Sequence, residues 1–356
     1  MKAGIIGLQG SGKSTIFQIL AQGKASGALS ASRKQEPNVA SVKVPDPRLD
    51  HLSSLFKPEK ITPAVVEFAD VPALVRGRGQ DMVLAPLRTV DVLIHVVRTF
   101  EDDSNPHPEG SVDPERDRRD LNYELMLADI ASIEKRMERL EKDLKKGGKT
   151  PALAKEQGYL ERAKAWLESE KPLREMATDD EEKKLVRGFA FLSEKPMIEV
   201  ENVGEDQLSR LTEMVEHQKL AANTERTIVC GKLEAEMAEL PAEELLTFLA
   251  DYKLTESGSA RLIRTTYRLL GLISFFTVGE EECRAWTITN GTTAPRAAGV
   301  IHTDLQDHFI RAEVCHYDDF VKHGSHQALK EKGLLRLEGK DYIVKDGDIM
   351  EIRHSG

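Results

Sequence analysis

Residues 7–14 carry the clearest chemical motif in the chain. They read GLQGSGKS and fit the pattern GxxxxGK[ST], whose glycines let backbone N–H groups turn inward around a phosphate. Lys13 is expected to reach the β- and γ-phosphates of a nucleotide, and the Ser14 hydroxyl is expected to bind Mg²⁺. The nucleotide-binding residues predicted from this loop are Gly7, Gln9, Gly10, Ser11, Gly12, Lys13, Ser14 and Thr15.

The segments on either side of this loop are those that a phosphate-binding loop needs. Residues 3–7 form a short apolar run typical of a strand, and Lys13 to Leu20 form a helix-like segment. This context disfavours the alternative of a chance glycine turn. Further apolar runs at residues 64–70, 90–97, 195–202 and 226–230 alternate with helical stretches, which predicts a mostly parallel sheet in an α/β domain.

Two of these predicted strands end in polar residues that extend the nucleotide site. Asp70 closes the run AVVEFAD, where an aspartate associated with Mg²⁺ belongs. Asn202 and Glu205 close another strand in the pattern NxxE, and GTPases carry NKxD at this place. Glutamate is one methylene longer than the aspartate that reads guanine, and Val203 replaces the lysine that packs on the base. Asn202 can still bond the N6/N7 edge of adenine, so the pattern favours ATP over GTP.

The predicted sheet is interrupted between residues 112 and 190. The apolar positions there recur at alternating spacings of three and four, which is the a/d signature of a coiled coil. The segment KKGGKTP (145–151) breaks this pattern, so we expect an antiparallel helical hairpin, with an ordinary amphipathic helix as the alternative. The positions are Tyr123, Met126, Ile130, Ile133, Met137, Leu140 and Leu144, and then Leu153, Leu160, Ala163 and Leu167.

Lysines gather where the hairpin is expected to turn, at positions 142, 145, 146 and 149. The simpler interpretation is a solvated helix end, whose cations suit the C-terminal dipole, and the other is a tip that touches RNA. A net charge of −10 weighs against broad, sequence-independent binding of nucleic acid.

Composition narrows the remaining function classes. Three separated cysteines without a CxxC pair argue against a disulfide framework or a zinc knuckle, which favours a reducing compartment. No window approaches the roughly 18 apolar residues of a membrane span, so we expect a cytoplasmic protein. After about residue 272, short β-like runs separated by glycine-bearing turns predict a small α+β module whose histidines lack metal-ligand spacing.

Long stretches of the chain resemble the Obg-like ATPases, also called the YchF family, a branch of the translation-factor class of P-loop NTPases. The stretches are EPNVASVKVPDPRLD (36–50), HVVRTFEDD (95–103), residues 111–142, LVRGFAFLSEKP (185–196), the NxxE at 202–205, and residues 284–320 and 333–353. The last two resemble the TGS domain of that family. Stretches of this length are far more specific than a P-loop alone.

The resemblance implies a domain organisation that agrees with the boundaries above. It implies a P-loop G domain of residues 1–112 and 190–271, an inserted helical coiled-coil domain of residues 113–189, and a TGS domain of residues 272–356. It also implies hydrolysis that prefers ATP, a role near the ribosome in translation or stress responses, and a predominantly monomeric protein. A ribosome or ribosomal RNA partner is expected to be reached through the hairpin tip and the TGS domain. Cys230 and Gly231 lie where the base-contacting loop of the family belongs.

The resemblance also bears on the catalytic group. Leu74 occupies the position at which many GTPases carry the glutamine that orients water, and leucine cannot do so by hydrogen bonding. The catalytic group must therefore come from elsewhere. His95 matches a family histidine proposed for this part, and the alternative is a histidine buried at a strand end.

Three departures from the family pattern make nucleotide binding a firmer prediction than nucleotide hydrolysis. The loop reads GSGKS where the family usually reads NVGKS, an exchange that the phosphate cradle should tolerate. The switch-II motif DxxG is Asp70-Val71-Pro72-Ala73 here, and alanine lacks the conformational freedom of glycine. Lys34 stands where the switch-I threonine should complete the Mg²⁺ shell, unless Ser30 or Ser32 substitutes for it.

These observations lead to a first hypothesis and leave alternatives. The first hypothesis is a slow ATPase switch that uses ATP and Mg²⁺. One alternative is a nucleotide-gated binding module with little or no hydrolysis, because both switch motifs are altered. The others are a GTPase and a small-molecule kinase, although no lid or acceptor pocket is evident for a kinase.

Overall fold

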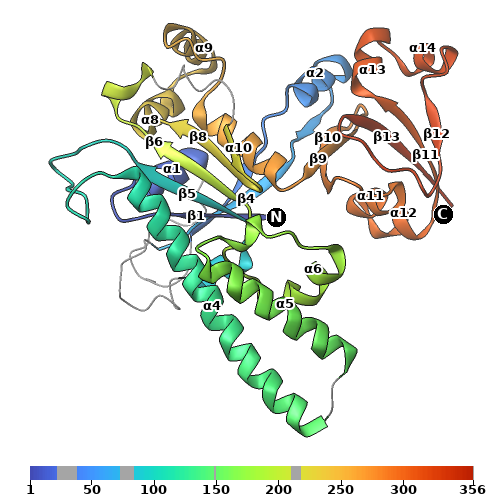
Figure 1. Cartoon of the computed structure of the whole chain (residues 1–356). Helices are drawn as coiled ribbons and strands as arrows, with labels where there is room; N and C mark the ends of the chain where they lie inside the picture. The colour runs from blue at the N-terminus through green and yellow to red at the C-terminus, as the bar shows by residue number, and fades with distance from the viewer. Residues whose placement is uncertain (22–37, 73–83, 148–149, 210–217, 356) are drawn as a thin grey trace. The chain divides into compact units, whose positions relative to one another are not determined.

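The computed structural model describes residues 1–21, 38–72, 84–147, 150–209 and 218–355. By compactness the chain forms two units (Figure 1). The first comprises Met1–Ala40 and Glu67–Leu262, and the second comprises Ser41–Val66 and Ile263–Gly356. The two are described separately below.

The first unit is built on a seven-stranded sheet with the order β2-β4-β1-β5-β6-β8-β7, although β2 from Ser41 on and the first two residues of β4, Val65 and Val66, count with the second unit. The central pairs β4–β1, β1–β5, β5–β6 and β6–β8 are parallel, and β7 is antiparallel to β8. The predicted parallel sheet is thus confirmed. The strands are β1 (Lys2–Ile6), β2 (Asn38–Lys43), β4 (Val65–Asp70), β5 (Val92–Arg98), β6 (Met197–Asn202), β7 (Gln218–Ala221) and β8 (Thr224–Val229).

Every residue of β5 and β6 is buried, as expected for strands of a parallel sheet that is covered on both faces. Helices α1 (Lys13–Leu20) and α8 (Gly231–Glu239) pack on each other. Leu121 and Leu125 of the long helix α4 pack with Ile6, Leu93 and Met197 of the sheet. The further helices of this unit are η1 (Ala85–Thr89), η4 (Glu205–Gln207), α9 (Ala242–Asp251) and α10 (Gly258–Leu269). Helix α10 crosses the boundary, and its residues from Ile263 on belong to the second unit.

The insertion is a helical hairpin, as predicted (Figure 1). Helix α4 (Pro114–Gly147) is followed by α5 (Pro151–Glu168), and the predicted a/d residues of the two helices form one apolar cluster. Leu144 lies outside the side chains that the structure describes. Of the four tip lysines, Lys142 is described and is exposed. The hairpin is followed by η2 (Leu173–Glu175), α6 (Asp180–Val186) and η3 (Arg187–Phe189).

The second unit contains a six-stranded sheet with the order β12-β11-β13-β9-β10-β3. Its strands are β3 (Lys60–Thr62), β9 (Leu272–Thr277), β10 (Glu282–Thr289), β11 (Phe309–His316), β12 (Arg336–Glu338) and β13 (Asp348–His354). Helices α11 (Ala294–Ile301) and α12 (Thr303–Asp307) contribute to its apolar core, and α13 (Tyr317–His323) and α14 (His326–Glu331) complete the predicted α+β module.

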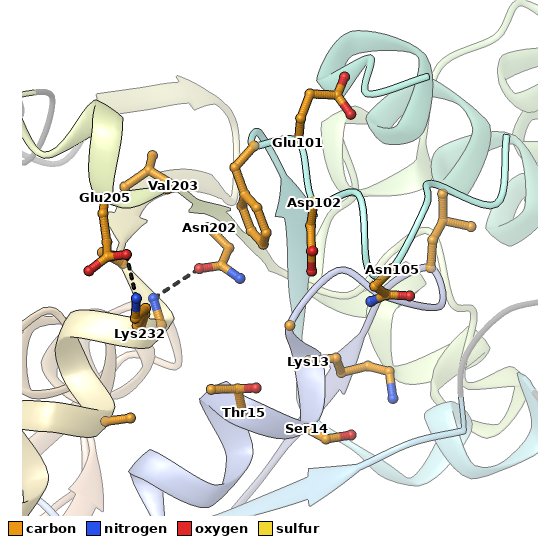
Figure 2. Close-up of a pocket in the computed structure, with 18 of the residues that line it drawn as sticks. Lys13, Ser14, Thr15, Glu101, Asp102, Asn105, Asn202, Val203, Glu205 and Lys232 are labelled. Carbon is orange, nitrogen blue, oxygen red and sulfur yellow. Dashed lines mark hydrogen bonds and ion pairs between the residues drawn. The ribbon is translucent and has the colours of Figure 1, made fainter. Parts of the chain in front are cut away.

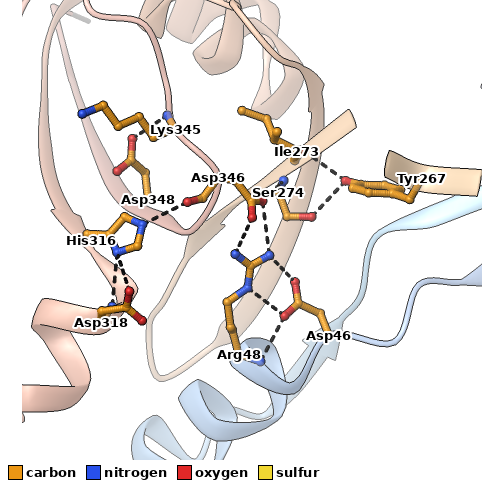
Figure 3. A network of polar contacts seen from close by, with 10 residues as sticks. All are labelled: Asp46, Arg48, Tyr267, Ile273, Ser274, His316, Asp318, Lys345, Asp346 and Asp348. Atoms are coloured by element: carbon orange, nitrogen blue, oxygen red, sulfur yellow. Dashed lines mark hydrogen bonds and ion pairs between the residues drawn. The ribbon is translucent and has the colours of Figure 1, made fainter. Parts of the chain in front are cut away.

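An early segment of the chain completes this C-terminal sheet. Strand β3 pairs in parallel with β10, and helix α2 (Pro47–Phe56) packs against β10. The rings of Phe56 and Phe320 stack with centroids 5.4 Å apart. Arg48 donates to Asp346 at 2.7 Å and to Asp46 at 2.9 Å (Figure 3). Residues 41–66 therefore belong to the compact unit of the C-terminal module, and the three-domain division given above stays a prediction.

No helix within the described ranges is both long and apolar enough to cross a membrane.

Packing of α2 predicts a specific loss of stability. Leu52 is fully buried and Leu55, on the same helix, is 48% exposed. We expect Leu52→Ala to lower the free energy of unfolding by about 2–5 kcal/mol, because it leaves a cavity. Leu55→Ala is the matched control and should change it by less than about 0.5 kcal/mol. Denaturant unfolding of the full chain measures both, and equal effects would contradict the packing of α2.

Candidate nucleotide-binding site

The phosphate loop lies between β1, which ends at Ile6, and α1, which begins at Lys13. Gly10 and Gly12 have φ angles of 78° and 89°, a region that residues with a side chain rarely adopt. Gly7 is needed for another reason, because an added Cβ would lie 2.6 Å from the carbonyl oxygen of Val96. The loop thus has the tight backbone that the motif predicts.

The predicted metal and phosphate residues contact one another. Lys13 Nζ lies 3.1 Å from Asp70 Oδ1 and donates to the carbonyl oxygen of Val71 at 2.9 Å. The Ser14 hydroxyl donates to Asp70 Oδ2 at 3.3 Å. A hydroxyl and a carboxylate are the hard oxygen ligands that Mg²⁺ prefers, so the residues present fit that ion. They could hold it through Ser14 and Asp70, as predicted from the sequence.

A cavity of about 1090 Å³ begins at this loop. It brings together most of the predicted nucleotide-binding residues, both from the phosphate loop and from the segments around the NxxE motif and Cys230. The predicted residues that line it are Gln9, Gly10, Gly12, Lys13, Ser14, Thr15, Asn202, Val203, Glu205, Cys230 and Gly231. Gly7, Ser11 and Asp70 are not among the lining residues, although Ser11 and Asp70 bond to residues that are.

Asn202 joins the two halves of this site. Its Nδ2 donates to the carbonyl oxygen of Ser11 at 3.0 Å, and its Oδ1 accepts from the backbone N–H of Gly231 at 3.0 Å. The side chain is buried, and a Cβ on Gly12 would lie 2.1 Å from Nδ2. Each end of the amide therefore has one backbone partner, and these two bonds leave one N–H and one lone pair of the amide unused.

One wall of the cavity was not anticipated from the sequence. Phe100, Glu101, Asp102 and Asn105 follow β5 and line the cavity. Figure 2 shows Glu101, Asp102 and Asn105 on this wall. The buried guanidinium of Arg98 holds this wall, because it donates to the carbonyl oxygens of Phe100 and Asn105 at 2.8 Å. Phe100, Glu101 and Asp102 belong to the stretch HVVRTFEDD (95–103) and Asn105 follows it, so most of the signal was present, but no local pattern assigned these residues a contact with nucleotide.

His95 lies within β5 and is 1% exposed. Burial lowers its pKa to about 3, and the nearby guanidinium groups of Arg118 and Arg174 add to this effect. It is not among the residues that line the described cavity. This position agrees with the alternative of a buried histidine, although His95 lies inside β5 and not at a strand end. Its catalytic role stays a prediction, which this geometry does not support.

Several predicted switch residues lie outside the described residues. These are Leu74, Ala73 and Lys34, together with Ser30 and Ser32. Cys230, which is described, is buried in the wall of the cavity, and burial raises the pKa of its thiol.

The contacts of Asp70 predict how metal and nucleotide binding are linked. Asp70→Asn keeps the size of the side chain and removes the charge that attracts Mg²⁺ and Lys13. We expect the affinity for ATP in the presence of Mg²⁺ to fall roughly tenfold or more, as for loss of a charge-assisted hydrogen bond. Affinity in the presence of a chelator should change much less. Calorimetric titration measures both, and an equal loss with and without Mg²⁺ would contradict a metal role.

The buried His95 predicts a pH dependence of stability. Its pKa is about 3 in the folded protein against 6.5 in the ordinary case, so the unfolded chain binds the proton more readily. Stability from the neutral imidazole is present above pH 6.5 and is lost as the pH falls toward 3.

We therefore expect the stability difference between the wild type and His95→Gln to shrink as the pH is lowered from 7 to 4. Chemical denaturation at each pH measures it. His354→Gln, at an exposed histidine, controls for loss of a histidine in general. A difference that does not depend on pH would overturn this prediction.

Comparison with known proteins agrees with this geometry. A family model for the C-terminal region of YchF GTPases, described as a protein of unknown function (DUF933), matches residues 272–355. The chain is 42% identical to the ribosome-binding ATPase YchF of Haemophilus ducreyi, over 99% of this chain and 98% of that protein. It is 41% identical to the protein of that name from Bacillus subtilis, over 99% of each chain.

The similarity extends to eukaryotic proteins and to a solved structure. Obg-like ATPase 1 of Pongo abelii is 38% identical over 98% of this chain and 91% of that protein. The structure of the Schizosaccharomyces pombe YchF GTPase matches with a TM-score of 0.86 and 30% identity, over 99% of this chain and 97% of that one. Because full-length relatives share well over 30% of their residues with it, this chain belongs to the YchF/Obg-like ATPase family.

Proposed function

We propose that this protein binds ATP in preference to GTP, hydrolyses it slowly with Mg²⁺, and acts as a nucleotide-controlled switch on the ribosome. One observation carries this proposal. A single cavity joins the phosphate residues Lys13 and Ser14 to the NxxE residues Asn202 and Glu205. The names of the bacterial relatives, ribosome-binding ATPase, support the reaction and the partner.

The chemistry assigned to each residue follows from its place in the site. Lys13 would hold the β- and γ-phosphates, and the backbone N–H groups of the glycine loop would surround them. A Mg²⁺ ion, when bound, neutralises phosphate charge, and Ser14 with Asp70 would hold it. Asn202 fixes the separation of the phosphate loop and the residues around Gly231, which would contact the base.

The helical hairpin is well placed to respond to the nucleotide, because the first turns of α4 contact β6, the strand that leads to Asn202. Arg118 in the first turns of α4 forms ion pairs with Glu199 and Glu201 of β6, the strand that ends at Asn202. His107 bonds Asp117 of α4 at 3.0 Å and follows the cavity wall in sequence. A shift of β6 or of this wall would therefore be passed to α4. This coupling would let the nucleotide act on the hairpin. We propose that the hairpin and the C-terminal module contact the ribosome in the cytoplasm, in line with the names of the bacterial relatives.

A second candidate is a binding module with little turnover. Pro72 follows Val71, whose carbonyl oxygen accepts from Lys13, and proline stiffens the switch-II motif. In this candidate the nucleotide sets the conformation of the protein and is not consumed. The solved relative from Schizosaccharomyces pombe is named a YchF GTPase, which keeps guanine nucleotide as an outcome of the same test.

One experiment separates these functions. Nucleotide-free protein is titrated with ATP and GTP with and without Mg²⁺, and phosphate release is then measured on the same sample. We expect tighter binding of ATP and slow turnover. Tight ATP binding without turnover would support the binding module, and tighter GTP binding would overturn the proposed specificity.

The partner is tested with the same preparation. The protein is sedimented with purified ribosomes in the presence of ATP, of ADP and of no nucleotide. We expect the sedimented fraction to depend on the nucleotide. A fraction that is the same in all three conditions would contradict a switch, and no sedimentation would contradict the ribosome as partner.

A further inference from the structure

An ion pair stands at the end of the cavity away from the phosphate loop (Figure 2). Lys232 Nζ lies 2.5 Å from Oε2 of Glu205, and both residues line the cavity. Glu205 belongs to the NxxE motif, whose acidic residue is the expected reader of a purine base. Lys232 therefore engages one oxygen of the carboxylate that would otherwise be free to accept hydrogen bonds from guanine.

The backbone on each side of this pair is held in place. Glu205 begins the short helix η4, which follows the end of β6 after two intervening residues, and Lys232 lies in the first turn of α8. The N–H of Gly231, the residue before Lys232, donates to Asn202 Oδ1, and Asn202 is the last residue of β6. The backbone next to Lys232 is thus bonded to the last residue of β6, and Glu205 follows the same strand in sequence.

Lys232 is the cation at the end of the cavity that lies away from the phosphate loop. The cations among the residues that line the cavity are Lys13 at the phosphate end and Lys232 at the other end. Carboxylates of Glu205 and Asp206 line the Lys232 end. The bond to Glu205 raises the pKa of Lys232, so its ammonium stays charged and remains a donor.

Hydrogen-bond complementarity links this pair to the choice of base. A carboxylate with two free oxygens can accept from both N1–H and N2–H₂ of guanine. Glu205 has one oxygen engaged by Lys232, and an ammonium beside it donates where guanine would also donate. Adenine offers an acceptor at N1 next to a donor at N6, which matches an ammonium next to a carboxylate.

We propose that Lys232 is a specificity-determining residue, which by engaging Glu205 prevents two-bond recognition of guanine and favours adenine. This inference rests on the ATP preference proposed above and assigns it to a residue outside the NxxE motif. Guanine could still place O6 on Lys232 and N1–H on Glu205, but its N2–H₂ would then lack the carboxylate. The pair therefore lowers the affinity for guanine and does not abolish it.

The size of the effect follows from the exposure of the pair. The side chains of Lys232 and Glu205 are 66% and 54% exposed, and exposed ion pairs are weak. We expect Lys232→Met, which keeps the apolar stem, to lower the ratio of ATP affinity to GTP affinity roughly three- to tenfold. Most of the change should be a gain in GTP affinity.

The test is calorimetric titration of the full-length wild type and variants with ATP, GTP and ITP in the presence of Mg²⁺. The matched control is Lys155→Met. Lys155 pairs with Glu181 at 2.9 Å between α5 and α6, with side chains 70% and 80% exposed, and does not line the cavity. We expect the control to keep the wild-type ratio. Because hypoxanthine lacks N2–H₂, Lys232→Met should improve binding of GTP more than of ITP.

A double-mutant cycle with Glu205→Gln tests that Lys232 acts through the carboxylate. In that background, Lys232→Met should change the ATP-to-GTP ratio little, and purely additive effects would overturn the proposal. An unchanged ratio in Lys232→Met alone would also overturn it. A wild type that shows no preference for ATP would instead refute the proposed function, so the two failures are distinguishable.

Discussion

The nucleotide site depends on one buried amide. Asn202 bonds the carbonyl oxygen of Ser11 and the N–H of Gly231, and so sets the distance between the glycine loop and the residues around Gly231. It lies at the end of β6, whose residues are all buried, so it has little room to move. The close packing of its Nδ2 explains why the loop carries glycine at position 12, in addition to the positive φ there.

The same strand connects the site to the insertion. Glu199 and Glu201 of β6 are buried carboxylates, and such groups need charged partners within the protein. Arg118 of α4 and Arg226 of β8 supply them. The long helix therefore begins in a network of buried charge and not in a flexible linker. A rigid root of this kind turns a small movement of β6 into a larger displacement at the far end of a long helix.

The parts of the fold that local patterns encode were predictable. The glycine loop, the apolar strands and the a/d spacing of Ile133 and Leu140 each depend on residues close in sequence, and the structure confirms them. The union of α2 and β3 with the C-terminal sheet was not predictable, because it depends on pairing across more than 200 residues.

In the candidate site, too, the residues within local motifs were predictable and the residues defined by distant contacts were not. The phosphate loop and the NxxE residues were predicted from their motifs and line one cavity, whereas Arg98 and Lys232 were not identified. The role of each comes from what it contacts after folding, which is a pair of carbonyl oxygens for Arg98 and the Glu205 carboxylate for Lys232. For His95, the sequence left a catalytic and a buried alternative, and the surroundings of the imidazole show that it is buried.

The interleaved path of the chain has a consequence for biosynthesis. The chain crosses between the compact units after residues 40, 66 and 262, so α2 and β3 are translated long before the strand β10 with which they pair. During synthesis, which proceeds from the N-terminus, the C-terminal sheet cannot be completed until the last segment has emerged. The C-terminal module therefore cannot be exchanged by replacing only the chain from β9 onward. A cut before β9 would separate the module from its edge strand β3 and from helix α2, which packs on β10.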